Sequence, residues 1–374
     1  MERAAPSLPT ILREWGRIGC IGFGGPPTHI ALLRRLCVDR RHWLDAAEFE
    51  DALAACNLLP GPASTQLSIY CAWRLRGPAG GLVGGLAFIV PGLVLILALA
   101  AVFLASAPPL WIRGAAAGAG AGVAAVAVQA GLSLVPASRA RARSRLRWAA
   151  YGLAGGAAAA TVGPWLVVVL LGCGAAEIVV RGRTPLLGVP LFAVSTGGLG
   201  ALAWVAFKVG ALSYGGGFVI VPLMQADAVH RYHWLTDGQF LNAVALGQVT
   251  PGPVVHTVAV VGYAAAGLGG GLLAAAVAFS PSFAFVLGGG RWFGALRVNP
   301  SARAFLDGAG PAAIGAILGS AIPLASALGT WWQFVLLGVA AVALLVLRRG
   351  VVATLVALGA VGALLAATHA VSVS

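Results

Sequence analysis

The chain has 374 residues, of which 59% are hydrophobic and 9% are charged, and its formal net charge is +13. Because soluble domains carry about a quarter charged residues, this composition excludes an ordinary globular protein and predicts an all-α polytopic membrane protein. All but one of the 24 basic residues are arginines, set mostly in short loops. This pattern is typical of cytoplasmic loops and indicates no nucleic acid partner. We therefore expect a multi-pass protein of the cell (inner or plasma) membrane, in contact with the lipid bilayer.

The first predicted element is an apolar segment that ends in a glycine run at residues 22–27. Glycine lets backbone N–H groups be exposed, and a helix that restarts after it offers a positive dipole end to an anion. Gly24 and Gly25 are therefore candidate substrate-binding residues, with close helix packing as the alternative. Arg17 lies two helical turns before Gly24, on the same expected face. It is either a further anion ligand or the partner of Glu14, one turn away.

The second predicted element is a re-entrant hairpin of residues 49–59 and 63–73, each too short to cross a bilayer. The two prolines of the Pro-Gly-Pro break between its arms remove two backbone donors and end a helix. Neutral hydrogen-bonding groups flank the break and suit a tetrahedral oxyanion, although such groups also hold membrane helices together. The candidate substrate-binding residues here are Asn57, Pro60, Gly61, Pro62, Thr65 and Gln66.

Further apolar runs follow the hairpin. Those long enough to cross a hydrocarbon core include 79–105, 114–135, 304–325 and 350–370, two short spans lie at 148–162 and 164–180, and further spans lie at 268–290 and 331–347. Another span is expected to start near Leu186. The odd number of crossings expected between the two hairpins requires that the second hairpin face the other way.

A duplication underlies this order. With an offset of 191, residues 19–88 align without a gap, including Trp43-Leu44 with Trp234-Leu235 and Pro60-Gly61-Pro62 with Pro251-Gly252-Pro253. Arginines crowd residues 34–41 of the first copy but residues 291–303 of the second. Because arginine marks the cytoplasmic side, we expect two inverted-topology repeats with broken and re-entrant helices, divided as 1–185 and 186–374.

The offset also assigns candidate residues to the second copy. Lys208, the only lysine, is equivalent to Arg17 and has no acid close to it in sequence. Gln248, His256 and Thr257 are equivalent to Asn57, Thr65 and Gln66. The second set of candidate substrate-binding residues is Lys208, Gly215, Gly216, Gln248, Thr250, Pro251, Gly252, Pro253 and Thr257. Histidine titrates near neutral pH, so His256 and His29 are candidates for proton coupling, with structural hydrogen bonding as the alternative.

Taken together, these motifs resemble the chromate transporter family of the two-domain, long-chain type. The resemblance rests on residues 22–30 and 59–70 of the first half and on residues 207–217 and 245–253 of the second. It implies export of chromate from the cytoplasm, with sulfate as the related oxyanion, and two homologous halves of opposite orientation. Two positions depart from the family pattern, Asn242 where an acid is expected and His256 where an aliphatic residue is usual.

The sequence therefore predicts a secondary transporter that exports chromate and related oxyanions and gives chromate resistance. The alternative is an uptake transporter for sulfate or another oxyanion with the same architecture. We expect no enzyme, because the acids form no pattern typical of a metal site or nucleophile, and no cofactor. The coupling ion, and whether the chain forms a homo-oligomer, stay open at this point.

Overall fold

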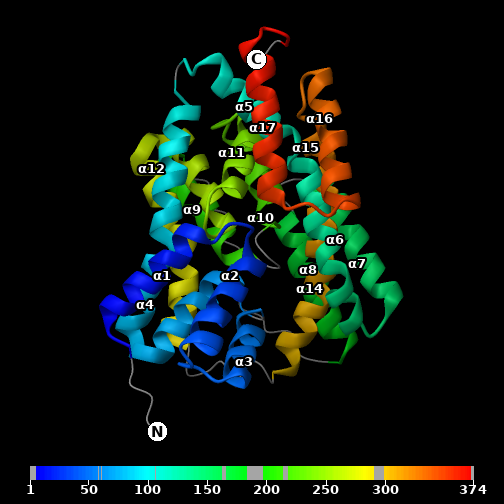
Figure 1. Cartoon of the computed structure of the whole chain (residues 1–374). Helices are drawn as coiled ribbons and strands as arrows, with labels where there is room; N and C mark the ends of the chain where they lie inside the picture. The colour runs from blue at the N-terminus through cyan, green and yellow to red at the C-terminus, as the bar shows by residue number, and fades with distance from the viewer. Residues whose placement is uncertain are drawn as a thin grey trace.

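The computed structural model describes residues 6–57, 59, 61–105, 107–161, 166–182, 197–213, 218–289 and 299–371. Every regular element in these ranges is a helix and none is a strand (Figure 1). Four apolar helical stretches in the described ranges are long enough to cross a membrane: Ala63–Phe103, Leu110–Arg141, Val254–Gly288 and Pro300–Ser326. The chain is thus an all-α polytopic membrane protein, as the composition predicted.

The first copy contains the helices α1 (Leu8–Ile21), α2 (Pro26–Arg34), α3 (Ala46–Cys56) and α4 (Ala63–Phe103), with the π-helix η1 (Arg35–Arg40) after α2. The second copy contains α9 (Gly198–Leu212), α10 (Ile220–Gln225), η3 (Ala226–Arg231), α11 (Asp237–Val249), the 3₁₀ turn η4 (Val254–His256) and α12 (Thr257–Phe283). The remaining elements are α5 (Leu110–Ala121), α6 (Val123–Arg141), α7 (Arg145–Thr161), α8 (Leu166–Val180), η5 (Ala284–Gly288), α14 (Pro300–Gly319), α15 (Ala321–Ser326), α16 (Trp331–Ala341), η7 (Val342–Val346) and α17 (Val351–Ala367).

The backbone repeats with the same offset of 191 as the sequence. The two π-helices η1 and η3 occupy equivalent positions. The residue two positions after each π-helix, His42 or His233, has a positive φ of 50° or 53°. Gly61 and Gly252 also match, with φ of 120° and 96° in the two Pro-Gly-Pro breaks. Such values favour glycine because a Cβ is strained there. The aligned motifs therefore form the same local structures in both copies.

A sharp hairpin bend follows each break. The backbone leaves helical geometry at Arg76 and Gly77 within α4, and at Ala266 and Gly267 within α12. The second bend comes one residue earlier than the offset of 191 predicts, because the turn needs a positive φ and falls on the available glycine. The two arms then pack closely, since a Cβ on Gly80 would lie 2.4 Å from the Ala72 carbonyl oxygen.

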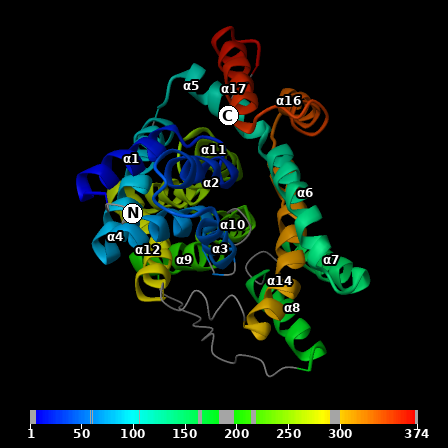
Figure 2. The same cartoon turned by 60° about the horizontal axis from the view of Figure 1, so that its bottom comes forward.

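The core helices of the two copies gather on one side of the molecule. α1 packs against α4, and α9 packs against α12 in the same way. The copies meet where α4 contacts α12, and the break of each reaches the other. Gly252 donates its N–H to the Gly22 carbonyl at 3.0 Å, while Gly61 lies beside the Gly210 carbonyl. Figure 2 shows α6, α7, α8 and α14 as a second group beside this core.

Candidate functional site

A pocket of about 1030 Å³ lies between the first Pro-Gly-Pro break and the second group of helices. Its wall on the core side comes from the end of α3, the break and the start of α4, including Asn57 and Gly61. The opposite wall comes from α6 and α14, with Arg181 from the end of α8. The first break therefore lines a cavity, which is one of the two settings in which a broken membrane helix is tolerated.

Four arginines line this pocket: Arg141, Arg143, Arg181 and Arg303. Arg181 is neutralised, because it donates to Glu177 at 2.8 Å and to Asp307 at 2.9 Å. Arg141 and Arg143, at the exposed end of α6, have no acidic side chain within 4.0 Å among the described residues. The wall of the pocket thus carries excess positive charge and attracts anions.

The start of α4 adds a second attraction for anions. Pro62 is the N-cap and provides no side-chain hydrogen bond, and its carbonyl accepts from the N–H groups of Thr65 and Gln66 at 3.0 Å. The N–H groups of Ala63 and Ser64 have no backbone acceptor in the described part of the chain. Gly61 and Ala63 at this helix start line the pocket. Helix N-termini bind anions through such N–H groups and the helix dipole. Here the helix end and the arginines face the same space.

The sequence-predicted residues of the first break fall into two groups. Asn57 and Gly61 line the pocket, whereas Thr65 and Gln66 are fully buried in the first turn of α4. The Thr65 hydroxyl has no hydrogen-bond partner within the described part of the chain. Pro60 lies outside the described residues.

The second break is packed into protein. Gln248, Thr250 and Thr257 are buried. The Thr250 hydroxyl donates to the Leu246 carbonyl of α11 and the Thr257 hydroxyl to the Val254 carbonyl of η4, both at 2.9 Å. Around Gly252 the fit is tight, because a Cβ on Gly92 of α4 would lie 2.1 Å from the Pro251 carbonyl oxygen. Pro253 is the N-cap of η4. Gly215 and Gly216 lie outside the described residues.

The two histidines proposed for coupling are fully buried near this second break. The His29 ring contacts the Gly22 carbonyl through Nε2 at 2.8 Å and the Ser64 hydroxyl through Nδ1 at 3.3 Å. His256 packs edge-on against Phe279, and its ring lies beside Gly252. Gly24 and Gly25, just before α2, both have positive φ. The contacts of the His29 ring with Gly22 and Ser64 are sufficient to explain a structural role for this residue. A role of His29 in proton coupling stays a prediction.

Lys208 has an acidic partner that the sequence pattern did not indicate. Its ammonium pairs with the carboxylate of Asp227 on η3, and the Asp227 side chain is only 3% exposed. The ring of Trp204 lies 5.9 Å from the Lys208 nitrogen. An acid 19 residues away in sequence is brought close because α9 packs against α10, which continues directly into η3. Anion binding by Lys208 therefore competes with this ion pair.

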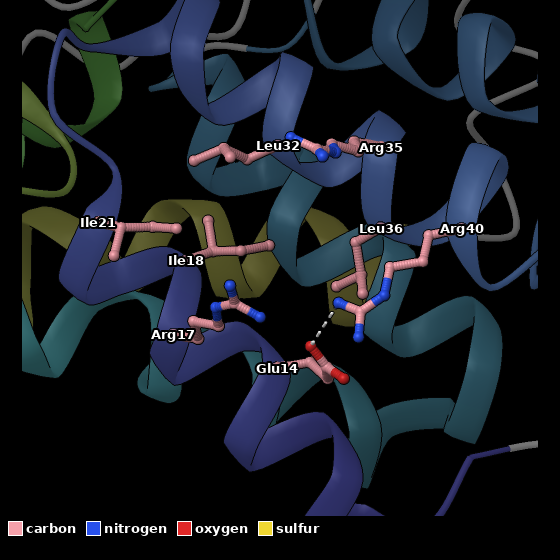
Figure 3. A pocket seen from close by; sticks show the side chains of 8 residues that line it. All are labelled: Glu14, Arg17, Ile18, Ile21, Leu32, Arg35, Leu36 and Arg40. Carbon is pink, nitrogen blue, oxygen red and sulfur yellow. Dashed lines mark ion pairs between the residues drawn. The ribbon is translucent and has the colours of Figure 1, made fainter.

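Arg17, the equivalent of Lys208, is exposed and lines a separate pocket of about 370 Å³. This pocket lies between α1, α2 and η1 and contains neither Pro-Gly-Pro break (Figure 3). Glu14 pairs with Arg41 at 2.6 Å and not with Arg17. The structure thus brings Asn57 and Gly61 together in one pocket, but it does not bring Arg17 to them.

The arginines of the large pocket were not among the sequence candidates. Arg141 and Arg143 lie in the most basic stretch of the chain, which also has a simple explanation as a cytoplasmic loop. Only the packing of α6 and α14 beside the break places them at the pocket. The only indication of these residues in the sequence was the clustering of arginines within this short stretch.

A model of the chromate transporter family matches residues 9–178 and 200–365. The chain is 32% identical to the chromate transport protein of Cupriavidus metallidurans, over 85% of this chain and 83% of that protein. It is 29% identical to the chromate transport protein of Pseudomonas aeruginosa, over 85% and 81% of the two chains. No solved structure matches the chain.

Proposed function

The chain belongs to the chromate transporter family, and from this premise we propose that it is a secondary transporter of the inner membrane that exports chromate from the cytoplasm. Sulfate, a tetrahedral dianion of similar size, is the related substrate of this proposal. Export of chromate would give the cell chromate resistance. The observation that carries the proposal is the positively charged pocket at the first break.

The pocket offers a dianion the kind of contacts that it needs. Hydrogen bonds to charged groups contribute about 1.5–3 kcal/mol each, and Arg141 and Arg143 have no acid within the described residues to compete for them. Asn57 adds a neutral donor, and the start of α4 adds backbone N–H groups. We assign the principal substrate contacts to these groups, while the second break and Lys208 remain candidates for a second set.

The duplication supports an alternating-access mechanism. In this proposal the units 1–185 and 186–374 are inverted repeats that rock against each other around a site near the bilayer midplane. The matching backbone features and the contact of each break with the other copy agree with such an exchange of roles. The first break lines a pocket, whereas the second break is packed against protein, so a ligand in the pocket can reach only the first break in this structure.

Flux measurements test the proposal. In everted vesicles, we expect accumulation of labelled chromate that unlabelled sulfate inhibits. A double variant R141Q/R143Q should need about 100-fold more chromate, or more, for half-maximal flux. The matched control R348Q/R349Q removes the same charge from exposed residues before α17 and should behave like the wild type. Uptake by right-side-out vesicles alone would favour the import alternative, and equal flux in all three proteins would exclude the pocket.

A further inference from the structure

The smaller pocket is chemically different from the large one. Figure 3 shows its two sides, with Arg17, Ile18 and Ile21 on α1 facing Leu32 and Arg35 on the neighbouring helix. Leu36 and Arg40 complete the lining, together with Glu14. Cationic and apolar side chains therefore share one cavity of about 370 Å³. A free inorganic anion would gain nothing from the apolar half.

The side chains that line this pocket carry a net positive charge. Glu14 is its one acid among the described lining residues, and it already accepts from Arg41 at 2.6 Å, with Arg40 at 3.9 Å. Arg17 and Arg35 are exposed and have no acidic group within 4.0 Å in the described ranges. Two guanidinium groups are thus available to a negatively charged ligand, and such groups suit phosphate oxygens.

The apolar half continues onto the outer surface of the protein. Ile21 is 47% exposed, and Leu12 and Phe23 on the same segment are 56% and 41% exposed. In a membrane protein such side chains face lipid tails. Ile21 therefore connects the arginines of the pocket to a surface that acyl chains cover.

We propose that this pocket binds an anionic phospholipid, with the phosphate between Arg17 and Arg35 and an acyl chain along Ile21 and Leu32. Basic pockets at the cytoplasmic ends of membrane helices bind anionic headgroups, and the arginines of residues 34–41 predict that side here. The lipid would hold α1 against α2 and η1. This role assigns Arg17 to the lipid and leaves the dianion to the large pocket.

Native mass spectrometry of the full-length protein tests the proposal, with phosphatidylglycerol and phosphatidylcholine as the added lipids. The wild type should retain phosphatidylglycerol, and R17Q/R35Q should retain it roughly tenfold less. R348Q/R349Q, which loses the same charge elsewhere, should retain it like the wild type. Leu32→Trp fills the apolar half without a change of charge and should also lower retention.

Three results would overturn the proposal. The first is equal retention of phosphatidylglycerol by R17Q/R35Q and R348Q/R349Q, which would indicate that the lipid is held by the net positive charge of the protein and not by this pocket. The second is equal binding of phosphatidylcholine and phosphatidylglycerol to the wild type. The third is displacement of the lipid by inorganic phosphate or chromate, with weaker chromate binding in R17Q/R35Q, because the pocket would then hold a free oxyanion. Size-exclusion chromatography of each variant checks the fold. If R17Q/R35Q does not fold, Leu32→Trp still tests the pocket, because it fills the apolar half without changing the charge; wild-type retention in this variant would then overturn the proposal.

Discussion

The ion pair of Lys208 and Asp227 allows the roles of structure and substrate binding to be separated. Lys208→Met removes the partner of a carboxylate that is 3% exposed. Breaking a buried ion pair in this way costs about 3–5 kcal/mol, because the remaining charge is left without compensation. Arg231 is a poor replacement, since it lies 4.0 Å from the other carboxylate oxygen and its side chain is 44% exposed.

The double variant K208M/D227L removes both charges. Replacing a buried pair with apolar side chains is often neutral or stabilising, so thermal stability should return to near the wild-type value. Thermal unfolding in detergent measures stability, and chromate flux into everted vesicles measures function. If Lys208 also contacts the dianion, the double variant will be stable and inactive.

Two outcomes would refute this reasoning. If Lys208→Met alone is as stable as the wild type, the carboxylate is not paired as described. If the double variant recovers both stability and flux, the prediction that Lys208 binds substrate is wrong and the pair is only structural. Asp227→Leu alone serves as the reciprocal control, since it leaves Lys208 14% exposed and closer to solvent.

The packing of the second break and the charge cluster beside the large pocket give two further predictions. Gly92→Ala places a methyl group 2.1 Å from the Pro251 carbonyl oxygen and should cost about 1–3 kcal/mol, with lower flux, whereas Gly172→Ala has open space and should be neutral by thermal unfolding. Equal melting temperatures in both variants would contradict the tight contact. Glu177→Gln deprives two arginines and Tyr151 of a carboxylate, so it should destabilise the contact of α7 with α8 by about 3–5 kcal/mol. Unchanged unfolding of this variant would show that the cluster contributes little.

The sequence was sufficient to predict the helical class and the repeated local structures. Proline and glycine have strong backbone preferences, so the breaks at Gly61 and Gly252 could be located from their residue types alone. The offset of 191 does not predict the exact position of the bend at Gly267. The bend requires a residue with positive φ, and it therefore forms at the nearest glycine, one residue before the position equivalent to Gly77. The local backbone conformation could thus be predicted where a single residue type, proline or glycine, determines it.

The candidate site was harder to predict because its parts lie far apart in the chain. Asn57 and Gly61 were expected, yet their neighbours Arg141 and Arg303 come from α6 and α14, which no repeat or motif connects to the break. Lys208 was expected to be without an acid, since Asp227 approaches it only through tertiary packing. Arg17 was grouped with Lys208 by the duplication, although it lines a different pocket.

Equilibrium binding of labelled chromate to the purified protein tests most directly whether the large pocket holds the dianion. We predict that R141Q/R143Q weakens binding about 100-fold or more, that Asn57→Ala weakens it less, by about threefold to tenfold, and that R348Q/R349Q leaves it unchanged. This gradient follows from two charged donors and one neutral donor in the same cavity. Wild-type affinity in folded R141Q/R143Q would contradict the account.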